Sequence, residues 1–168
     1  VTEYLGMKPF EHEFKIMGMA PYGKDEDVDR LYLKIKHLLQ LDNNGKFISY
    51  VPSNLYKYEL SKLFLNEKFQ NICGAIQKMT EKLIIEWVNY WIKKTTISQI
   101  IVSGGVFMNI KACKELIDSE IPIRALLSTE ENNHLFKNSI LISGKDAQRI
   151  SNQKNHSGVI AIGELPKK

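Results

Sequence analysis

The feature that most constrains the fold is a strand-like run that ends in two glycines and continues as a helix, from Ile100 to Asn109. β-Branched residues lead into Gly104 and Gly105, and a helical pattern runs from Asn109 to Asp118. Glycine lacks a Cβ and tolerates φ > 0, so a phosphate or a nucleotide can approach such a turn closely. A strand that turns directly into a helix predicts an α/β domain.

The glycine pair leaves two interpretations open, because such pairs also serve plain tight turns. The amide of Asn109 can donate to and accept from a purine edge or a ribose, and it can equally cap the helix. The run is not a P-loop, since no Gly-Lys-Ser/Thr follows, and it is not the dinucleotide GxGxxG pattern.

The strongest helical pattern covers residues 66–94, where apolar residues recur at steps of three and four. Its aromatic end is typical of core packing more than of a cofactor box. With strands expected over 97–102 and 121–127 and a helix over 109–118, the order is α–β–α–β. The prediction is a mixed sheet, partly parallel, flanked by helices.

Shorter elements are expected on both sides of this region. Before it, the patterns predict the end of a helix over 1–5, a Pro- and Gly-rich loop over 8–24, a helix over 25–40, a strand over 46–51 and a helix over 54–65. After Ser128 the pattern weakens: a helix suits 130–142, loop or frayed helix suits 145–157, and a short strand suits 159–162.

Composition excludes several classes. A hydrophobic content of 43% and a charged content of 25% are ordinary for a globular protein. The net charge of +4 comes from scattered lysines rather than a dense stripe, which disfavours nucleic-acid binding. The longest apolar run is too short for a membrane span. Cys73 and Cys113 read as buried thiols of a cytoplasmic protein, and the histidines show no zinc-binding spacing.

The segment from His12 to Gly23 has the composition of an ordered loop. Lys15 lies near Gly18 and Gly23, a mixture that suits contact with an anion. The alternative is a surface loop with a few packed apolar groups.

Three strings occur in order: Thr2-Glu-Tyr-Leu-Gly6, Glu13-Phe-Lys-Ile-Met-Gly-Met-Ala-Pro-Tyr-Gly23 and Ser103-Gly-Gly-Val-Phe-Met-Asn109. Together they resemble the O-carbamoyltransferase family of nodulation protein NodU and the tobramycin and cephamycin carbamoyltransferases. The Lys-Ile-Met-Gly-Met-Ala-Pro-Tyr-Gly string is specific to that family, whereas the Gly-Gly-Val string is shared with tRNA threonylcarbamoyl-transfer proteins. The resemblance covers about residues 1–118.

The resemblance implies an actin/hexokinase/Hsp70-like (ASKHA) domain of two lobes. Residues 1–127 would be its second lobe and residues 128–168 a divergent C-terminal tail. Such enzymes move a carbamoyl group from carbamoyl phosphate, through a carbamoyl-adenylate made with ATP, to a hydroxyl of a small-molecule or glycan acceptor. A separate YrdC-like domain makes the adenylate, and the first domain holds it with a metal, usually iron.

By position, the resemblance implies a nucleotide site built from two of these strings. Ser103, Gly104, Gly105 and Asn109 would line the nucleotide, and Glu13, Lys15 and Gly18 would face the ribose or phosphates. The catalytic acid or base is not identified. The family's metal-binding His-x-x-x-His pair is absent from the 168 residues, and its Gly-Asp signature is replaced by a run that offers Glu130 or Glu131.

Three functions therefore stay open: part of a carbamoyltransferase completed by a missing lobe and a YrdC-like domain, an inactive remnant or non-enzymatic nucleotide-binding module, and a degenerate relative in tRNA modification. The Met-Gly-Met-Ala-Pro-Tyr-Gly string argues against the third. A lone lobe would expose apolar surface and associate, for example as a homodimer.

Overall fold

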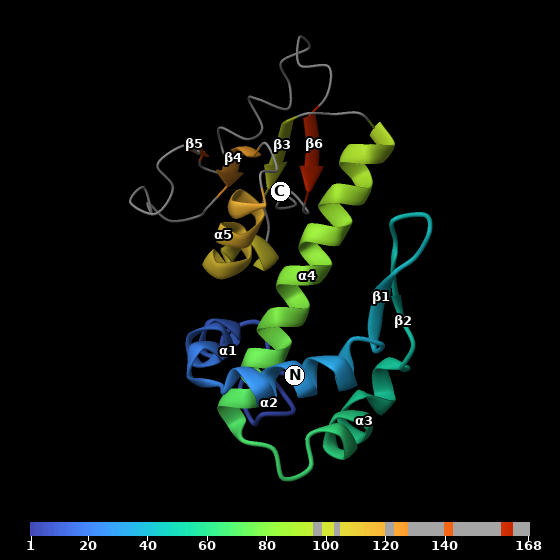
Figure 1. Ribbon diagram of the computed structural model, residues 1–168, viewed down its shortest axis with the longest axis vertical. Coiled ribbons are helices and arrows are strands. Elements are labelled where there is room, and N and C mark those ends of the chain that lie inside the picture. The colour runs from blue at the N-terminus through green and yellow to red at the C-terminus, as the bar shows by residue number, and fades with distance from the viewer. Residues whose placement is uncertain (96–98, 103–104, 120–122, 128–139, 143–158, 163–168) are drawn as a thin grey trace. The chain divides into compact units, whose positions relative to one another are not determined.

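The computed structural model of the protein describes residues 1–95, 99–102, 105–119, 123–127, 140–142 and 159–162 (Figure 1). These residues form a mixed α/β structure. The chain divides into two compact units, Val1–Trp87 and Val88–Lys168. The division falls inside the longest helix, α4 (Phe69–Thr95), which therefore begins in one unit and ends in the other.

The first unit is mainly helical. Its elements are α1 (Glu13–Met19), the 3₁₀ turn η1 (Ala20–Tyr22), α2 (Asp25–Ile35), β1 (Leu39–Leu41), β2 (Phe47–Ser49), the 3₁₀ turn η2 (Ser53–Leu55), α3 (Tyr56–Leu63) and the first part of α4.

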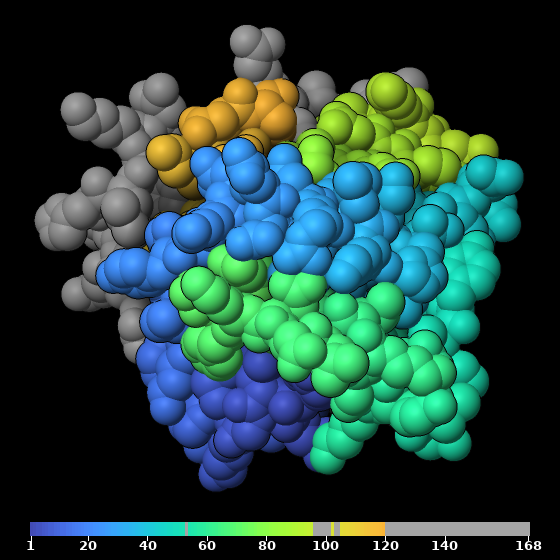
Figure 2. Space-filling model, turned by 60° about the horizontal axis from the view of Figure 1, so that its bottom comes forward, coloured from blue at the N-terminus to red at the C-terminus, as the bar shows by residue number. Residues whose placement is uncertain are grey.

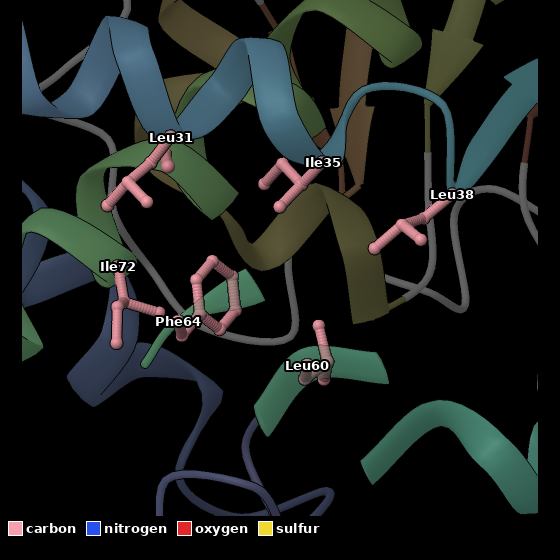
Figure 3. Packing of buried hydrophobic residues seen from close by; sticks show 7 residues of the cluster. Leu31, Ile35, Leu38, Leu60, Phe64 and Ile72 are labelled. Carbon is pink, nitrogen blue, oxygen red and sulfur yellow. The ribbon is translucent and has the colours of Figure 1, made fainter. Parts of the chain in front are cut away.

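The core of the first unit joins α2, α3 and α4. Val28, Leu31 and Ile35 recur on one side of α2 and are buried. Three acidic residues occupy the first turn of α2, where their negative charge stabilises the positive end of the helix dipole. Figure 3 shows side chains from these helices pointing toward one another. The buried cluster consists of Leu31, Ile35, Leu38, Leu60, Phe64, Ile72 and Ala75. On the surface, the segments coloured blue and green around residues 25–40 and 60–75 lie side by side (Figure 2).

The helix expected over 25–40 ends earlier, at Ile35, and its last residues form a strand instead. β1 pairs with β2 in an antiparallel hairpin, with Gln40 opposite Ile48. Asp42 directs the turn, because its Oδ1 accepts from the backbone N–H groups of Asn44 (2.9 Å) and Lys46 (2.7 Å). Gly45 follows at φ +74°, a conformation that glycine adopts without strain. The expected strand over 46–51 is confirmed as β2.

Residues 2–6 form a turn with the hydrogen bonds of a helix C-terminus: the backbone N–H of Leu5 donates to the carbonyl oxygen of Val1 (2.9 Å) and that of Met7 donates to the carbonyl oxygen of Thr2 (3.0 Å). Gly6, at φ +73°, ends the turn as expected. One further expectation in the first unit is wrong. The segment expected as a loop over 8–24 contains α1 and η1, because Gly18 is tolerated inside a short helix and Pro21 lies in the first turn of η1. The helices expected over 54–65 and 66–94 are confirmed as α3 and α4.

The second unit contains a four-stranded sheet in the order β5-β4-β3-β6, and every neighbouring pair is parallel (Figure 1). Its elements after α4 are β3 (Gln99–Val102), the 3₁₀ turn η3 (Gly105–Met108), α5 (Ile110–Asp118), β4 (Ile123–Leu127), β5 (Ile140–Ile142) and β6 (Val159–Ile162). The predicted α–β–α–β order is confirmed, and so is the strand over 159–162. The expectation of a mixed, only partly parallel sheet is wrong for this unit, because all of its described strands run parallel.

One element of the second unit differs from the expectation. Residues 140–142, expected at the end of a helix, form strand β5 and pair with residues 125–127 of β4. The rest of that expected helix, and the loop over 145–157, lie outside the described residues. The division into a second lobe over 1–127 and a divergent tail over 128–168 stays a prediction.

Candidate functional site

The sequence-predicted site residues fall into two groups. Glu13, Lys15 and Gly18 share helix α1 of the first unit. Gly105 and Asn109 lie at the junction of η3 and α5 in the second unit. Ser103 and Gly104 lie outside the described residues.

Glu13 has a local structural task at the start of α1. Its Oε1 accepts a hydrogen bond of 2.8 Å from the backbone N–H of Phe10, and this bond lowers the pKa of Glu13. Phe10 is held at φ +66°, which is unusual for an aromatic residue, and its side chain is 98% exposed. The carboxylate therefore stabilises the bend that leads into the helix.

Lys15 and Gly18 present a suitable surface for an anion. They lie three positions apart, so both face the same side of α1, and both are exposed. The Lys15 ammonium lies 5.9 Å from the Phe14 ring centroid, and within the described residues no ion pair involves it. A Cβ built on Gly18 would meet nothing within 4 Å, so packing does not require glycine there. A ligand could therefore come close to the backbone beside a free ammonium.

The segment from Glu13 to Gly23 packs against Val28 of α2 at its C-terminal end. A Cβ added to Gly23 would lie 2.7 Å from Val28 Cγ2, and one added to Gly74 of α4 would lie 2.5 Å from the same atom. Only glycine fits at either position without a shift of its neighbours. Gly74 thus lets α2 pack closely on the backbone of α4, and Gly23 lets it pack closely on the end of the Glu13–Gly23 segment.

Asn71 completes this packing, and sequence reasoning missed it. Its side chain is almost fully buried; Oδ1 accepts from the backbone N–H of Lys24 (3.0 Å) and Nδ2 donates to Asp27 Oδ2 (3.0 Å). The available signal was an amide next to the apolar stripe of α4, where an unpaired polar group would be costly. Asn71 of α4 therefore holds both the backbone that follows Gly23 and the first turn of α2.

In the second unit, Asn109 caps α5. Its Oδ1 accepts from the backbone N–H of Ala112 (3.1 Å), so the helix begins at Ile110 rather than at Asn109. The capping interpretation of this residue is therefore confirmed, while contact with a nucleotide stays a prediction. Gly105 is exposed, and a Cβ added there would meet nothing within 4 Å.

Both cysteines are free and buried, as expected. Burial raises the pKa of Cys73 to about 11 and that of Cys113 to about 11. The Cys113 thiol also lies 3.1 Å from the carbonyl oxygen of Phe107. Thiols with such pKa values are protonated at neutral pH, so neither supplies a nucleophilic thiolate.

Among the described residues, no three His, Cys, Asp or Glu side chains are grouped closely enough to hold a metal ion. Glu130 and Glu131 lie outside those residues. Nor does any described helix have the length and apolar character needed to cross a membrane.

Comparison with known proteins places the chain in a family. The family described as carbamoyltransferase N-terminus matches residues 1–121. The chain belongs to this family. The match includes all three sequence strings, and the recognition made from them is confirmed.

The individual relatives are distant. The chain is 28% identical over 135 residues to an uncharacterized protein of Synechocystis sp., which covers 69% of this chain and 21% of that protein. It is 23% identical over 109 residues to nodulation protein NolO of Bradyrhizobium diazoefficiens, a match that covers 63% of this chain and 20% of NolO. It is 26% identical over 125 residues to nodulation protein NolNO of Sinorhizobium fredii, a match that covers 71% of this chain and 18% of NolNO.

The chain thus spans about a fifth of the length of the curated relatives it matches. No solved structure gives a significant match.

Proposed function

We propose that the chain supplies part of the N-terminal domain of an O-carbamoyltransferase. The observation that carries the proposal is the family match over residues 1–121. The reaction would transfer a carbamoyl group from carbamoyl phosphate, through a carbamoyl-adenylate made with ATP, to a hydroxyl of a small-molecule or glycan acceptor.

Within that proposal, Lys15 is the residue that contacts phosphate. Its support is an exposed ammonium without an ion pair among the described residues, next to the open backbone at Gly18. A cation held beside phosphates stabilises negative charge where water is displaced. Glu13 would act indirectly, by fixing the turn that starts α1.

Gly105 and Asn109 would contribute the second part of the nucleotide site. The Asn109 Oδ1 caps α5, and the same side chain would contact the ligand at the start of that helix. Gly105 would let the ligand approach the backbone. An ASKHA fold for the complete domain is supported by the parallel strands around this junction.

The remaining parts would come from outside these residues: the other lobe, the YrdC-like domain and the metal, which would be iron or another divalent ion. The described residues offer no cluster for that metal. A cytoplasmic location is supported by the two free buried thiols.

Calorimetric titration with ATP tests the nucleotide site. We expect saturable binding that Lys15→Gln abolishes, since the variant loses the phosphate contact. The matched control is Lys68→Gln, which removes the same charge from the exposed residue that precedes α4. Equal binding by both variants would contradict the assignment of Lys15.

Asn109→Asp and Gly105→Ala refine the second part of the site. Aspartate keeps the capping oxygen but removes the amide donor, so α5 stays capped while ATP binding weakens. Alanine at Gly105 is accommodated by the described fold and blocks close approach of a ligand. Transfer itself is measured with the YrdC-like domain added, by carbamoyl-phosphate-dependent carbamoylation of a glycan. ATP binding without any transfer would favour a non-enzymatic nucleotide-binding module.

A further inference from the structure

The first unit has a pocket of about 350 Å³ that involves none of the sequence motifs. Three segments form its walls: the C-terminal end of α2, strand β1 and the α4 segment from Met79 to Glu86. This volume lies at the lower end of the range for small-molecule sites.

The polar lining of the pocket is mainly cationic. Lys36 comes from the end of α2 and Lys82 from α4, and a single carboxylate, Glu86, faces the same space. Tyr32 and Gln40 add a hydroxyl and an amide. Two ammonium groups on different walls, with one carboxylate, leave an excess of positive charge in a small volume.

This excess is not neutralised within the described part of the chain. Lys82 lies 5.9 Å from the Tyr32 ring centroid, and no ion pair involves it there. Glu86 follows Lys82 by four positions, but a lysine placed before a glutamate is the weaker orientation for such a pair. By contrast Lys78, on the same ring at 5.8 Å, is paired with Asp29. Lys82 is therefore available to an external anion.

The β1 wall of the pocket is fixed in place by Trp87, the residue after Glu86. Its indole Nε1 donates to the carbonyl oxygen of Gly45 in the hairpin turn (3.0 Å), and its ring lies 5.4 Å from that of Phe47 in β2. The hairpin is thus attached to α4 at the residue that follows Glu86 of the pocket lining. A preformed pocket of this kind loses less entropy on binding than a mobile one.

We propose that this pocket binds a small organic anion bearing phosphate or carboxylate groups. Lys36 and Lys82 hold the charged group, because ammonium groups bind phosphate and carboxylate as point charges. Tyr32 and Gln40 hydrogen-bond to its polar substituents, and leucine and methionine side chains of β1 and α4 contact its carbon skeleton. The site is independent of the proposed carbamoyl transfer.

The test is titration of the 168-residue chain with inorganic pyrophosphate and, separately, with citrate, followed by amide chemical shifts. An ammonium about 4 Å from an anion changes the affinity by a factor of about five even in water. We therefore expect Lys36→Gln and Lys82→Gln each to weaken binding about fivefold. Tighter binding of pyrophosphate would identify phosphate as the preferred group, and tighter binding of citrate would identify carboxylate. The changed residues are exposed, so the fold is expected to persist.

Charge-matched variants outside the pocket make the test specific. Lys68→Gln and Lys15→Gln should leave the pocket affinity unchanged, and the second also separates this site from the proposed nucleotide site. Glu86→Gln should tighten binding, because it removes repulsion, while Glu26→Gln on the first turn of α2 should not. Absence of binding, equal loss in Lys68→Gln, or loss only in Lys15→Gln would overturn the proposal.

Discussion

Val28 of α2 packs directly on the backbone of Gly74 in α4, and we expect these two residues to be energetically coupled. A Cβ on Gly74 would lie 2.5 Å from Val28 Cγ2 and 3.3 Å from the Ala20 carbonyl oxygen. Carbon atoms in contact prefer about 3.5–4.0 Å, so the overlap is about 1 Å. Overpacking of this kind costs roughly 2–3 kcal/mol, offset by about 1 kcal/mol of helix propensity. Gly74→Ala should therefore destabilise the fold by about 1–2 kcal/mol.

Val28→Ala should destabilise the fold through the opposite defect. The valine is 9% exposed, and its loss of two methyl groups costs about 2 kcal/mol in transfer and cavity terms. In the double variant the new Cβ at position 74 occupies the volume that Val28 Cγ2 leaves. We expect a total loss of about 1 kcal/mol instead of the additive 3–4 kcal/mol, which is a coupling of about 2–3 kcal/mol.

The assay is urea unfolding of the four proteins, followed by circular dichroism. The matched control pairs Val28→Ala with Gly18→Ala, where the added Cβ meets nothing within 4 Å. That pair should be additive, and Gly18→Ala alone should stabilise α1 by up to about 1 kcal/mol. Additivity of Gly74→Ala with Val28→Ala to within about 0.5 kcal/mol would refute the packing argument.

Three further predictions follow from polar groups. Asn71→Asp places a buried carboxylate next to Asp27, and burial beside a like charge raises the folded-state pKa of that carboxylate. Above this pKa the variant should have a free energy of unfolding about 2 kcal/mol below that of the wild type. The difference should disappear as the pH falls below about 4, as measured by urea unfolding. A hydrogen bond from Arg30 lowers the pKa of Glu67 in the folded state. The contribution of Glu67 to stability is therefore fully present above its pKa in the unfolded chain and is lost as the pH falls through its pKa in the folded state. Glu67→Gln should make the free energy of unfolding fall less steeply at acid pH, and an unchanged pH dependence would contradict this. Cys73 and Cys113, with pKa values of about 11, should react with iodoacetamide at pH 8 roughly a hundredfold more slowly than a free thiol, and equal rates in native and urea-unfolded protein would refute their burial.

Sequence patterns predicted the elements whose periodicity is long and unambiguous. α4 has an apolar stripe that extends over many turns, and β3 and β4 follow it as short, mainly apolar runs, so the type of each element was clear. The end of α2 was not clear, because Leu38 and Leu39 fit the helical stripe as well as the following strand. Only the pairing of β1 with β2 decides between the two.

Local composition misled the prediction for α1, where Pro21 and two glycines suggested a loop. A local bond fixes the start of the helix, where the Glu13 carboxylate accepts from the Phe10 N–H, and a long-range bond holds the chain after η1, where Asn71 accepts from the Lys24 N–H. No local pattern contains the second contact, since it joins residues 47 positions apart. β5 was missed for a similar reason, because a three-residue strand is defined by its partner.

The candidate site could be predicted in part. Residue types and their order identified the family, and the Asn109 cap was among the stated alternatives. The exposure of Lys15 and the absence of a packing role for Gly18 came only from the structure, because neither is encoded in neighbouring residues.

The bond between the Trp87 indole and the Gly45 carbonyl has a practical consequence. The chain has two tryptophans, and replacing Trp91 by Phe leaves one fluorophore, placed where the hairpin meets α4. Its emission would shift to the red when the hairpin detaches and solvent reaches the indole. The protein thus has its own optical reporter of whether the β1–β2 hairpin is attached to α4.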